Sequence, residues 1–480
     1  MANFRGSFLS SYPFFLFFLL FAINSLALIS ADDHEISGST RLELIHRNSR
    51  KLSEKVGMDV RPKSQIENIK QLHHRDVQRR LTVVSWRPKA IETGASVAMP
   101  LHSGSDFGTG EYFVEAHVGT PGQKFLLVAD TGSELTWVKC NYNNCGRRRD
   151  CLRRIPNDKA VFSADLSSTF RPVVCSARMC KTELSNLFSL ARCPTNLSPC
   201  AYDYRYMEGS AALGIFAHET VSVVLTNGRK RQLNKVLIGC TKSVQDDQGS
   251  FKGANGVLGL GLGKNTFTSR VAEDFGGKFS YCLVDHLSPM NESSYIVLGQ
   301  NRIKTPLLSR MQQTKLVLGG AYGSLYGVQV TGISIGNLLL NIPAPVWNVN
   351  RGGGAIIDSG SSLTFLAEPA YKLVTAEFNK FLSKYERLPE DGGPFEFCFN
   401  PKGYRESLVP RLKIHFANGA VFQPPVKSYI LDVAPQTMCL GIVAASWPGI
   451  SVIGNIMQQN HLWELDVEKG ILGFAASSCT

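Results

Sequence analysis

An internal repeat constrains the fold of this 480-residue chain more than any other feature. The segments VADTGSELTWV (128–138) and IIDSGSSLTFL (356–366) both run from apolar residues into Asp-[Thr/Ser]-Gly-Ser and on to Leu-Thr. Two apolar residues and a glycine follow each copy, at 257–259 and 452–454. One Asp-Thr-Gly tripeptide is usually a turn, but two copies inside a longer matched repeat indicate two related lobes. Each lobe would carry the same strand, loop and return strand.

The repeated loops place one carboxylate in each lobe, Asp130 and Asp358. Apolar neighbours would bury each carboxylate, while Gly132 and Gly360 allow the tight backbone that lets peptide N–H groups approach it. If a pseudo-twofold axis relates the lobes, the carboxylates meet, and like charges ~3 Å apart share one proton. One can then act as general base on a water molecule while the other donates a proton to a carbonyl oxygen. The pattern predicts amide hydrolysis without a metal, a cofactor or a covalent intermediate.

After residue 110 the residue pattern is typical of a β protein. Hydrophobic residues make up 44% of the sequence, which excludes wholesale disorder. Short runs rich in β-branched and aromatic residues alternate with Gly, Pro and Asn, which is typical of strands joined by turns. The clearest runs are 111–121, 124–130, 219–225, 234–240, 355–360 and 462–467. We therefore expect a mainly all-β fold of two pseudo-symmetric lobes with a few short helices, such as one over 369–384.

Further motifs give the chain a resemblance to a known family. They are DTGS (130–133), CAYDYRYMEGS (200–210), GVLGLG (256–261), FSYCLV (279–284), DSGSS (358–362) and the closing segment 451–475. The chain resembles the pepsin-like aspartic proteases, and among them the cysteine-rich plant group typified by nepenthesins. The resemblance implies a bilobal fold, an aspartic endopeptidase that acts on polypeptides, no cofactor or metal, and a monomer.

The resemblance also implies roles for residues of the repeated loops. Asp130 and Asp358 would form the catalytic pair, and Ser133 would hydrogen-bond the outer side of Asp130. Thr131 and Ser359 would bond the two loops to each other beneath the pair. The full supporting set in the loops is Thr131, Gly132, Ser133, Ser359, Gly360 and Ser361.

Two aromatic residues complete the implied site. Tyr206 aligns with the tyrosine of the flap, the hairpin that closes over substrate in this family, and the indole N–H of Trp137 would reach its hydroxyl. Without the resemblance, both would be interpreted as ordinary core or hairpin aromatics. The flap departs from the family pattern because Met207 and Glu208 replace Gly and Asp, which removes backbone freedom at the tip and adds bulk near the cleft. A second hypothesis is therefore a non-catalytic inhibitor or binding protein on the same fold, similar to the xylanase inhibitors.

The N-terminus indicates a compartment. A lone Arg5 precedes an apolar run at 13–28 and then small residues, which is typical of a secretory signal peptide over 1–31. A signal anchor is the alternative. The C-terminus has no hydrophobic tail that would signal a lipid anchor. We therefore expect the chain in the secretory pathway, at the apoplast or vacuole, with no membrane anchor after the signal is removed.

Twelve cysteines fit an oxidising compartment, and seven of them lie between residues 140 and 200. An even count behind a signal peptide favours disulfides. A zinc cluster is the alternative, but the spacing lacks paired Cys-x-x-Cys motifs with histidine partners. The resemblance implies that Cys398 pairs with Cys439. Sequons at Asn196 and Asn291 are candidate glycosylation sites in the same compartment.

Residues 32–100 separate the signal from the β lobes and are polar and basic, with 13 Lys/Arg against 9 Asp/Glu. We expect a pro-segment with a marginal helix over 65–81, lying across the cleft as an intramolecular inhibitor. Acid would release it by protonating the carboxylates that face its cations. A solvated linker is the alternative. The lobes would then span 101–305, including a cysteine-rich insert at 140–200, and 306–480.

The net charge of +12 suggests nucleic acid as a partner, but its distribution argues against one. The first 100 residues carry +5 and residues 140–181 carry +6, so the rest of the body is close to neutral. No basic groove interleaved with aromatic residues accompanies this excess in the sequence. We expect the basic stretch Arg147–Arg154 to be a solvated, disulfide-pinned loop, with anion binding or docking as the alternative.

Overall fold

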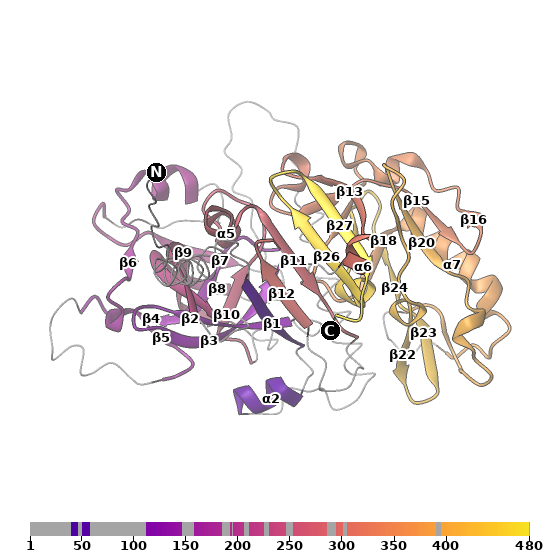
Figure 1. Cartoon of the computed structure of the whole chain (residues 1–480), viewed down its shortest axis with the longest axis horizontal. Helices are drawn as coiled ribbons and strands as arrows, with labels where there is room; N and C mark the ends of the chain where they lie inside the picture. The colour runs from indigo at the N-terminus through magenta and orange to yellow at the C-terminus, as the bar shows by residue number, and fades with distance from the viewer. Residues whose placement is uncertain are drawn as a thin grey trace, which may run out of the picture.

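The structure is a computed structural model in which two groups of strands flank a central sheet (Figure 1). Strands dominate and helices are few, so the expected mainly β, bilobal fold is confirmed. The structure describes residues 40–46, 50–57, 112–145, 158–184, 193, 195–205, 211–224, 230–245, 253–285, 294–300, 305–389 and 395–479.

Six antiparallel strands form the central sheet. Their spatial order is β1 (Thr40–His46), β12 (Ser294–Leu298), β11 (Lys278–Cys282), β26 (His461–Asp466), β27 (Ile471–Ala476) and β13 (Gln312–Val317). Every residue of β12 and of β26 is buried. Continuous burial of this kind means that both faces of the sheet are covered. The central sheet therefore joins the two halves of the chain, since β11 and β26 come from opposite halves and pair with each other.

The described part of the first lobe contains nine strands. They are β2 (Tyr112–Val118), β3 (Gln123–Asp130), β4 (Trp137–Asn141), β5 (Phe162–Ser163), β6 (Arg171–Pro172), β7 (Ala201–Arg205), β8 (Ala211–Val224), β9 (Lys230–Gln245) and β10 (Gly256–Gly259). The long strands β8 and β9 pair antiparallel, and β7 pairs with the first residues of β8. Helix α5 (Phe267–Phe275) follows β10 and is capped by the Thr266 hydroxyl, which accepts from the N–H of Ser269. The short helical turns of this lobe are η2 (Ala164–Leu166) and the π-helix η3 (Met179–Leu184).

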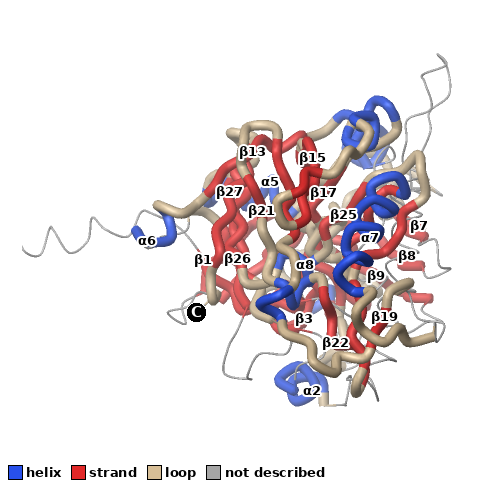
Figure 2. The backbone as a smooth tube through the Cα atoms, turned by 90° about the vertical axis from the view of Figure 1, so that its right-hand side faces the viewer, coloured by secondary structure: helices blue, strands red, loops and turns tan. Residues whose placement is uncertain are grey.

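The second lobe has one main sheet and two small ones. The main sheet runs β14 (Tyr326–Val328), β17 (Ala355–Ile357), β25 (Ser451–Ile453), β18 (Thr364–Ala367) and β24 (Ile442–Ala445). One small sheet has the order β16 (Leu338–Leu339), β15 (Val330–Ile335), β20 (Leu412–Phe416) and β21 (Val421–Phe422). The other has the order β19 (Cys398–Phe399), β23 (Thr437–Leu440) and β22 (Ile430–Ala434). The α-helices among the described residues of this lobe are α6 (Thr305–Leu308), α7 (Glu368–Leu382) and α8 (Asn455–Gln458). Its short 3-10 helices are η4 (Gly320–Tyr322), η5 (Ala344–Trp347), η6 (Val349–Arg351), η7 (Glu406–Leu408) and η8 (Val426–Ser428). Helix α7, blue in Figure 2, covers most of the helix expected over 369–384. It packs on β18 and β24.

The sequence repeat is also a structural repeat. Strand β3 runs parallel to β10, and β17 runs parallel to β25 in the same way. The glycine after each apolar pair must lack a side chain. A Cβ at Gly259 would lie 2.7 Å from the carbonyl carbon of Glu134, and one at Gly454 would lie 2.1 Å from the carbonyl oxygen of Leu363. The apolar-apolar-Gly pattern therefore marks the place where the return strand passes against the backbone that follows the repeated loop.

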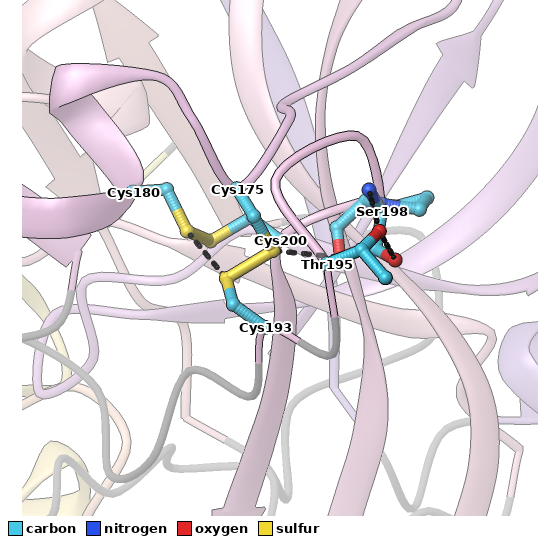
Figure 3. The surroundings of a disulfide bond; sticks show 7 residues. Cys175, Cys180, Cys193, Thr195, Ser198 and Cys200 are labelled. Atoms are coloured by element: carbon cyan, nitrogen blue, oxygen red, sulfur yellow. Dashed lines mark hydrogen bonds between the residues drawn. A yellow bond between two sulfur atoms is a disulfide. The ribbon is translucent and has the colours of Figure 1, made fainter.

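Five disulfides lie among the described residues, and no described cysteine is free. They are Cys140–Cys240, Cys175–Cys193, Cys180–Cys200, Cys282–Cys479 and Cys398–Cys439. The last is the pair that the resemblance implied. In the insert, the Sγ atoms of Cys180 and Cys193 lie 3.6 Å apart where two disulfides run side by side (Figure 3). The structure therefore pairs these sulfurs as disulfides rather than presenting them as thiolates to a metal.

Part of the N-terminal segment is folded onto the body. Strand β1 pairs with β12 and, through its last two residues, with β2, and helix α2 (Arg50–Val56) follows it. The buried side chains of this segment are Leu42, Leu44, Ile45 and Leu52. Residues 40–46 and 50–57 thus pack against the body through these side chains. The expected signal at 1–31 and helix at 65–81 lie outside the described residues. None of the helices in the described part is long and apolar enough to cross a membrane.

Candidate active site

The two repeated loops carry buried carboxylates in matching environments. Asp130 ends β3 and Asp358 directly follows β17, and their exposed fractions are 0% and 1%. The N–H of Gly132 donates to Asp130 Oδ1 at 2.9 Å, and the N–H of Gly360 donates to Asp358 Oδ1 at 2.9 Å. One oxygen of each carboxylate is therefore held by the backbone two residues later, in the close approach that glycine permits.

The loops bond directly to each other through Thr131 and Ser359. The N–H of Ser359 donates to Thr131 Oγ1 at 2.9 Å, and the N–H of Thr131 donates to Ser359 Oγ at 3.4 Å. The two hydroxyls lie 3.1 Å apart, and Thr131 Oγ1 also donates to Asp358 Oδ1 at 3.5 Å. Both residues are buried. The structure thus forms the cross-bond between the loops that the resemblance implied.

The serines that follow the two glycines differ. Ser361 Oγ donates to Asp358 Oδ2 at 2.8 Å, so this aspartate is hydrogen-bonded at both oxygens. Ser133 Oγ is buried and has no hydrogen-bond partner among the described residues, so the bond expected from Ser133 to Asp130 is not formed. The two loops are therefore matched at their glycines but not at the serines that follow them.

Two threonines of the repeat have a matching role that the sequence comparison left unassigned. The N–H of Gly259 donates to Thr136 Oγ1 at 3.1 Å, and the N–H of Gly454 donates to Thr364 Oγ1 at 3.2 Å. Each bond ties the return strand to the end of the loop. The signal was present in the sequence, because Thr136 and Thr364 occupy equivalent positions in the two copies.

The aromatic half of the expected site is described only in part. Trp137 is fully buried at the start of β4, in a cluster with Tyr202 of β7 and Phe216 of β8. Tyr206, with Met207 and Glu208, lies outside the described residues, between the paired strands β7 and β8. A cavity of about 520 Å³ lies beside the same strands, lined among others by Tyr142, Leu213 and Ile215. Neither Asp130 nor Asp358 is among the described residues that line this cavity, so we do not assign the cavity to the catalytic centre.

A third carboxyl group lies close to the first loop. Glu134 follows Ser133 directly and is 5% exposed. Burial raises the pKa of Glu134 to about 7, because a charged carboxylate is poorly solvated there. Sequence reasoning missed this group, since nothing in the local pattern shows that the surrounding chain buries it.

Comparisons with known proteins agree with this architecture. The family model described as "Xylanase inhibitor N-terminal" matches residues 112–300, and the model "Xylanase inhibitor C-terminal" matches residues 325–476. Aspartyl protease family protein 2 of Arabidopsis thaliana is 32% identical over 385 residues, covering 78% of this chain and 73% of that protein. Aspartic proteinase nepenthesin-1 of Nepenthes gracilis is 28% identical over 481 residues, covering 97% and 98%. The chain therefore belongs to the pepsin-like aspartic protease family, in its nepenthesin-like plant group.

Solved structures share the fold at lower identity. A crystal structure of edgp has a TM-score of 0.63 at 21% identity, covering 78% of this chain and 94% of that chain. Conglutin gamma, a basic 7S globulin from lupine seeds, has a TM-score of 0.59 at 18% identity, covering 77% and 92%. At these identities the likeness shows the fold alone. Family membership supports a protease role, and the fold is also compatible with other uses.

Proposed function

We propose that the chain is an aspartic endopeptidase that hydrolyses peptide bonds with a water molecule held between Asp130 and Asp358. The observation that carries the proposal is the pair of buried carboxylates on loops that bond to each other through Thr131 and Ser359. Carboxylates brought together in a buried site share one proton, because two adjacent negative charges are costly there. One member is then ready to accept a proton and the other to donate one.

The proposed reaction needs no covalent intermediate with the protein. The ionised carboxylate takes a proton from water as the water oxygen bonds to the carbonyl carbon of the peptide, and the protonated carboxyl gives its proton to the carbonyl oxygen. The C–N bond of the resulting gem-diol then breaks. The nitrogen receives the proton first taken from water, and one gem-diol hydroxyl returns a proton to the other carboxylate. The bonds from Gly132, Gly360 and Ser361 support this scheme because they fix the orientation of the carboxyl groups.

The flap completes the proposed site. Tyr206, which follows β7 in the sequence, would close over the bound polypeptide, with its hydroxyl accepting a hydrogen bond from the indole of Trp137. The burial of Trp137 beside β7 is consistent with this role. Met207 and Glu208 would then narrow the cleft beneath the hairpin tip, so we expect subsite preferences unlike those of relatives with glycine there.

We also propose that the protein is made as a zymogen with a pro-segment over 32–100 and lobes over 101–305 and 306–480. The insertion of β1 at the edge of the central sheet supports this, because the pro-segment then takes part in the fold. An ion pair reinforces the contact: Lys55 Nζ lies 2.9 Å from Glu115 Oε2. Arg41 lies 3.6 Å from the ring centre of Tyr295, where its charge faces the ring. Acid would weaken the ion pair and favour cleavage near residues 90–105.

A secretory route fits the described features. Five disulfides among the described residues are typical of an oxidising compartment. The sequon at Asn196 is exposed, and its next residue, Leu197, is 86% exposed, so a glycosyltransferase can reach this loop. Asn291 lies outside the described residues. We propose entry through the signal at 1–31, a destination in the apoplast or vacuole, and a monomer without a membrane anchor or nucleic-acid partner.

A second candidate function is a non-catalytic inhibitor or binding protein on the same fold. It is favoured by the replacement of Gly and Asp by Met207 and Glu208 in the flap, and by the names of the two matching family models. The intact loops at Asp130 and Asp358 favour the enzyme.

Digestion of a peptide library by acid-processed protein across pH 2–7, with and without pepstatin, distinguishes the two functions. We expect pepstatin-sensitive cleavage in acid that Asp130→Asn abolishes. Asp158→Asn, at an exposed aspartate, is the matched control and retains activity. Processed wild-type protein that cleaves no peptide under any of these conditions would refute the protease and favour the binder.

A further inference from the structure

A chain of buried hydrogen bonds ends at the backbone carbonyl of Asp358 in the second repeated loop. Gln458 of α8 is 0% exposed. Its Nε2 donates to the carbonyl oxygen of Asp358 at 3.2 Å and to that of Ile453 at 2.7 Å. Its Oε1 accepts from the hydroxyl of Tyr281 at 2.6 Å. Both ends of this amide are therefore occupied, and the orientation of its plane is fixed by the Tyr281 hydroxyl.

A second chain of hydrogen bonds ends at the backbone carbonyl of Asp130 in the first repeated loop. The N–H of Leu260 donates to the carbonyl oxygen of Asp130 at 2.7 Å. The carbonyl oxygen of Leu260 accepts from the hydroxyl of Tyr326 at 2.6 Å, and Tyr326 is 0% exposed. In each lobe, one N–H group bonds the carbonyl of the aspartate, and one tyrosine hydroxyl bonds the residue that carries this N–H. In the first lobe the two contacts fall on the N–H and the C=O of Leu260, which belong to adjacent peptide groups. In the second lobe they fall on the two ends of the Gln458 side-chain amide.

The two tyrosines come from the opposite halves of the chain to the loops they support. Tyr281 lies in β11, within the 112–300 segment, and supports the loop of Asp358. Tyr326 lies in β14, within the 325–476 segment, and supports the loop of Asp130. We propose that Tyr281 and Tyr326 are positioning residues that each hold the catalytic loop of the opposite lobe, with Gln458 as the link to Asp358. The expected effect of these residues on the rate of cleavage rests on the proposed protease function. Their expected effect on the stability of the loops does not.

The chemistry of the donors suits this role. Burial raises the pKa of Tyr281 and of Tyr326 above the ordinary value, so both hydroxyls stay protonated over the acidic and neutral range. Each can therefore donate at every pH at which the dyad works. Phenylalanine would fill almost the same volume without the hydrogen bond, so the substitution isolates the bond from the packing.

The first test is amide hydrogen exchange, which does not depend on activity. We expect Tyr281→Phe to speed exchange in the loop at 356–361 and Tyr326→Phe to speed it in the loop at 128–133. Tyr429→Phe is the matched control, because Tyr429 is also 0% exposed. Its hydroxyl donates to the carbonyl oxygen of Pro410 at 3.0 Å, which lies in neither repeated loop. The control should change neither loop. Faster exchange in the same-half loop, or equal effects of all three variants on both loops, would overturn the proposal.

The second test is kinetic. Loss of one positioning bond should lower kcat about tenfold with KM nearly unchanged, since a small displacement of a reacting group slows the chemical step more than binding. Tyr429→Phe should leave kcat unchanged, and unchanged kcat in Tyr281→Phe and Tyr326→Phe would refute positioning. If the wild-type protein itself cleaves no peptide, the protease proposal fails. Hydrogen exchange still decides whether Tyr281 and Tyr326 each hold the loop of the opposite lobe.

Gln458→Glu gives a pH signature that simple destabilisation would not produce. When protonated, the introduced carboxyl accepts from Tyr281 and donates to one carbonyl, so activity in acid should be largely kept. When ionised it cannot donate, and it faces the carbonyls of Asp358 and Ile453. We expect activity of this variant to fall at a lower pH than in the wild type, whereas Gln458→Met should lose activity equally at all pH values. Parallel pH profiles of Gln458→Glu and wild type would contradict the role of Gln458.

Discussion

The hydroxyl of Thr131 accepts a hydrogen bond from the backbone N–H of Ser359 at 2.9 Å, although the two residues belong to different lobes. Their hydroxyls lie 3.1 Å apart, and both side chains are buried. Because a buried N–H that loses its partner is costly, each loop depends on the other for its position. The two carboxylates are therefore arranged as one unit and not as two independent groups.

Replacing Thr131 by valine tests this dependence. Thr131→Val removes the hydroxyl and leaves the N–H of Ser359 without its acceptor, so we expect a loss of about 1–3 kcal/mol in the free energy of unfolding. We also expect a fall in kcat of about tenfold or more, because the loops can separate. Thr131→Ser keeps the hydroxyl and should retain most of both properties. Urea unfolding and peptide cleavage measure the two effects, and wild-type behaviour of Thr131→Val would contradict the role.

The buried carboxyl of Glu134 predicts a loss of stability toward neutral pH. Burial raises its pKa from 4.5 to about 7 in the folded state, so the folded protein favours the neutral form. This contribution is complete below pH 4.5, declines as pH rises, and is lost above pH 7, for a total of about 3 kcal/mol. In urea unfolding at pH 4–8, Glu134→Gln should lose less stability than wild type over this window. Equal losses in the two proteins would show that Glu134 is not the group responsible.

The ion pair between Lys55 and Glu115 predicts the pH at which the N-terminal segment loosens. Burial opposes ionisation of Glu115, but hydrogen bonds and charges from Lys124 and Lys55 outweigh it and lower the pKa of Glu115. The contribution is present above the ordinary pKa and is lost as pH falls through the lowered one. Glu115→Gln should therefore show self-trimming at a higher pH than wild type, measured by gel analysis after timed incubations.

Lys55→Gln provides the control for that measurement. It breaks the same pair from the other side, so it should shift trimming in the same direction. Combining it with Glu115→Gln should add little, because the interaction is already absent. Fully additive shifts, or trimming at the wild-type pH in both single variants, would rule out the pair as the pH-sensitive contact.

The close passage of the return strand predicts that Gly454 cannot be replaced. A Cβ there would lie 2.1 Å from the carbonyl oxygen of Leu363, so Gly454→Ala should displace the second loop and abolish cleavage. Gly332→Ala is the control, because its Cβ would meet only the flexible end of Leu339, at 3.2 Å. Thermal unfolding of both variants gives the comparison, and a stable, active Gly454→Ala would contradict the tight contact.

Much of the site could be predicted because its pattern is local. The repeated Asp-[Thr/Ser]-Gly loops carry their own apolar strands and glycines, so the sequence alone indicated which residues approach each carboxylate. The contact between Thr131 and Ser359 came from the family resemblance, and the structure forms it. A helix over 369–384 was also expected, and α7 covers most of it.

The parts that sequence reasoning missed depend on partners far apart in the chain. Nothing near Gln458 shows that Tyr281 will fill one end of its amide and Asp358 the other. The burial of Glu134 is likewise set by surrounding structure and not by its neighbours in sequence. The bond expected from Ser133 to Asp130 is not formed, although the equivalent Ser361 bonds Asp358.

The cooperation of the two carboxylates is tested most directly by a double-mutant cycle. Processed wild-type protein, Asp130→Asn, Asp358→Asn and the double variant should be compared for peptide cleavage in acid, with folding verified by thermal unfolding. If Asp130 and Asp358 act as one unit on one water molecule, each single variant should lose about as much activity as the double variant. Substantial cleavage by either single variant, or losses that add in the double variant, would contradict a shared catalytic pair.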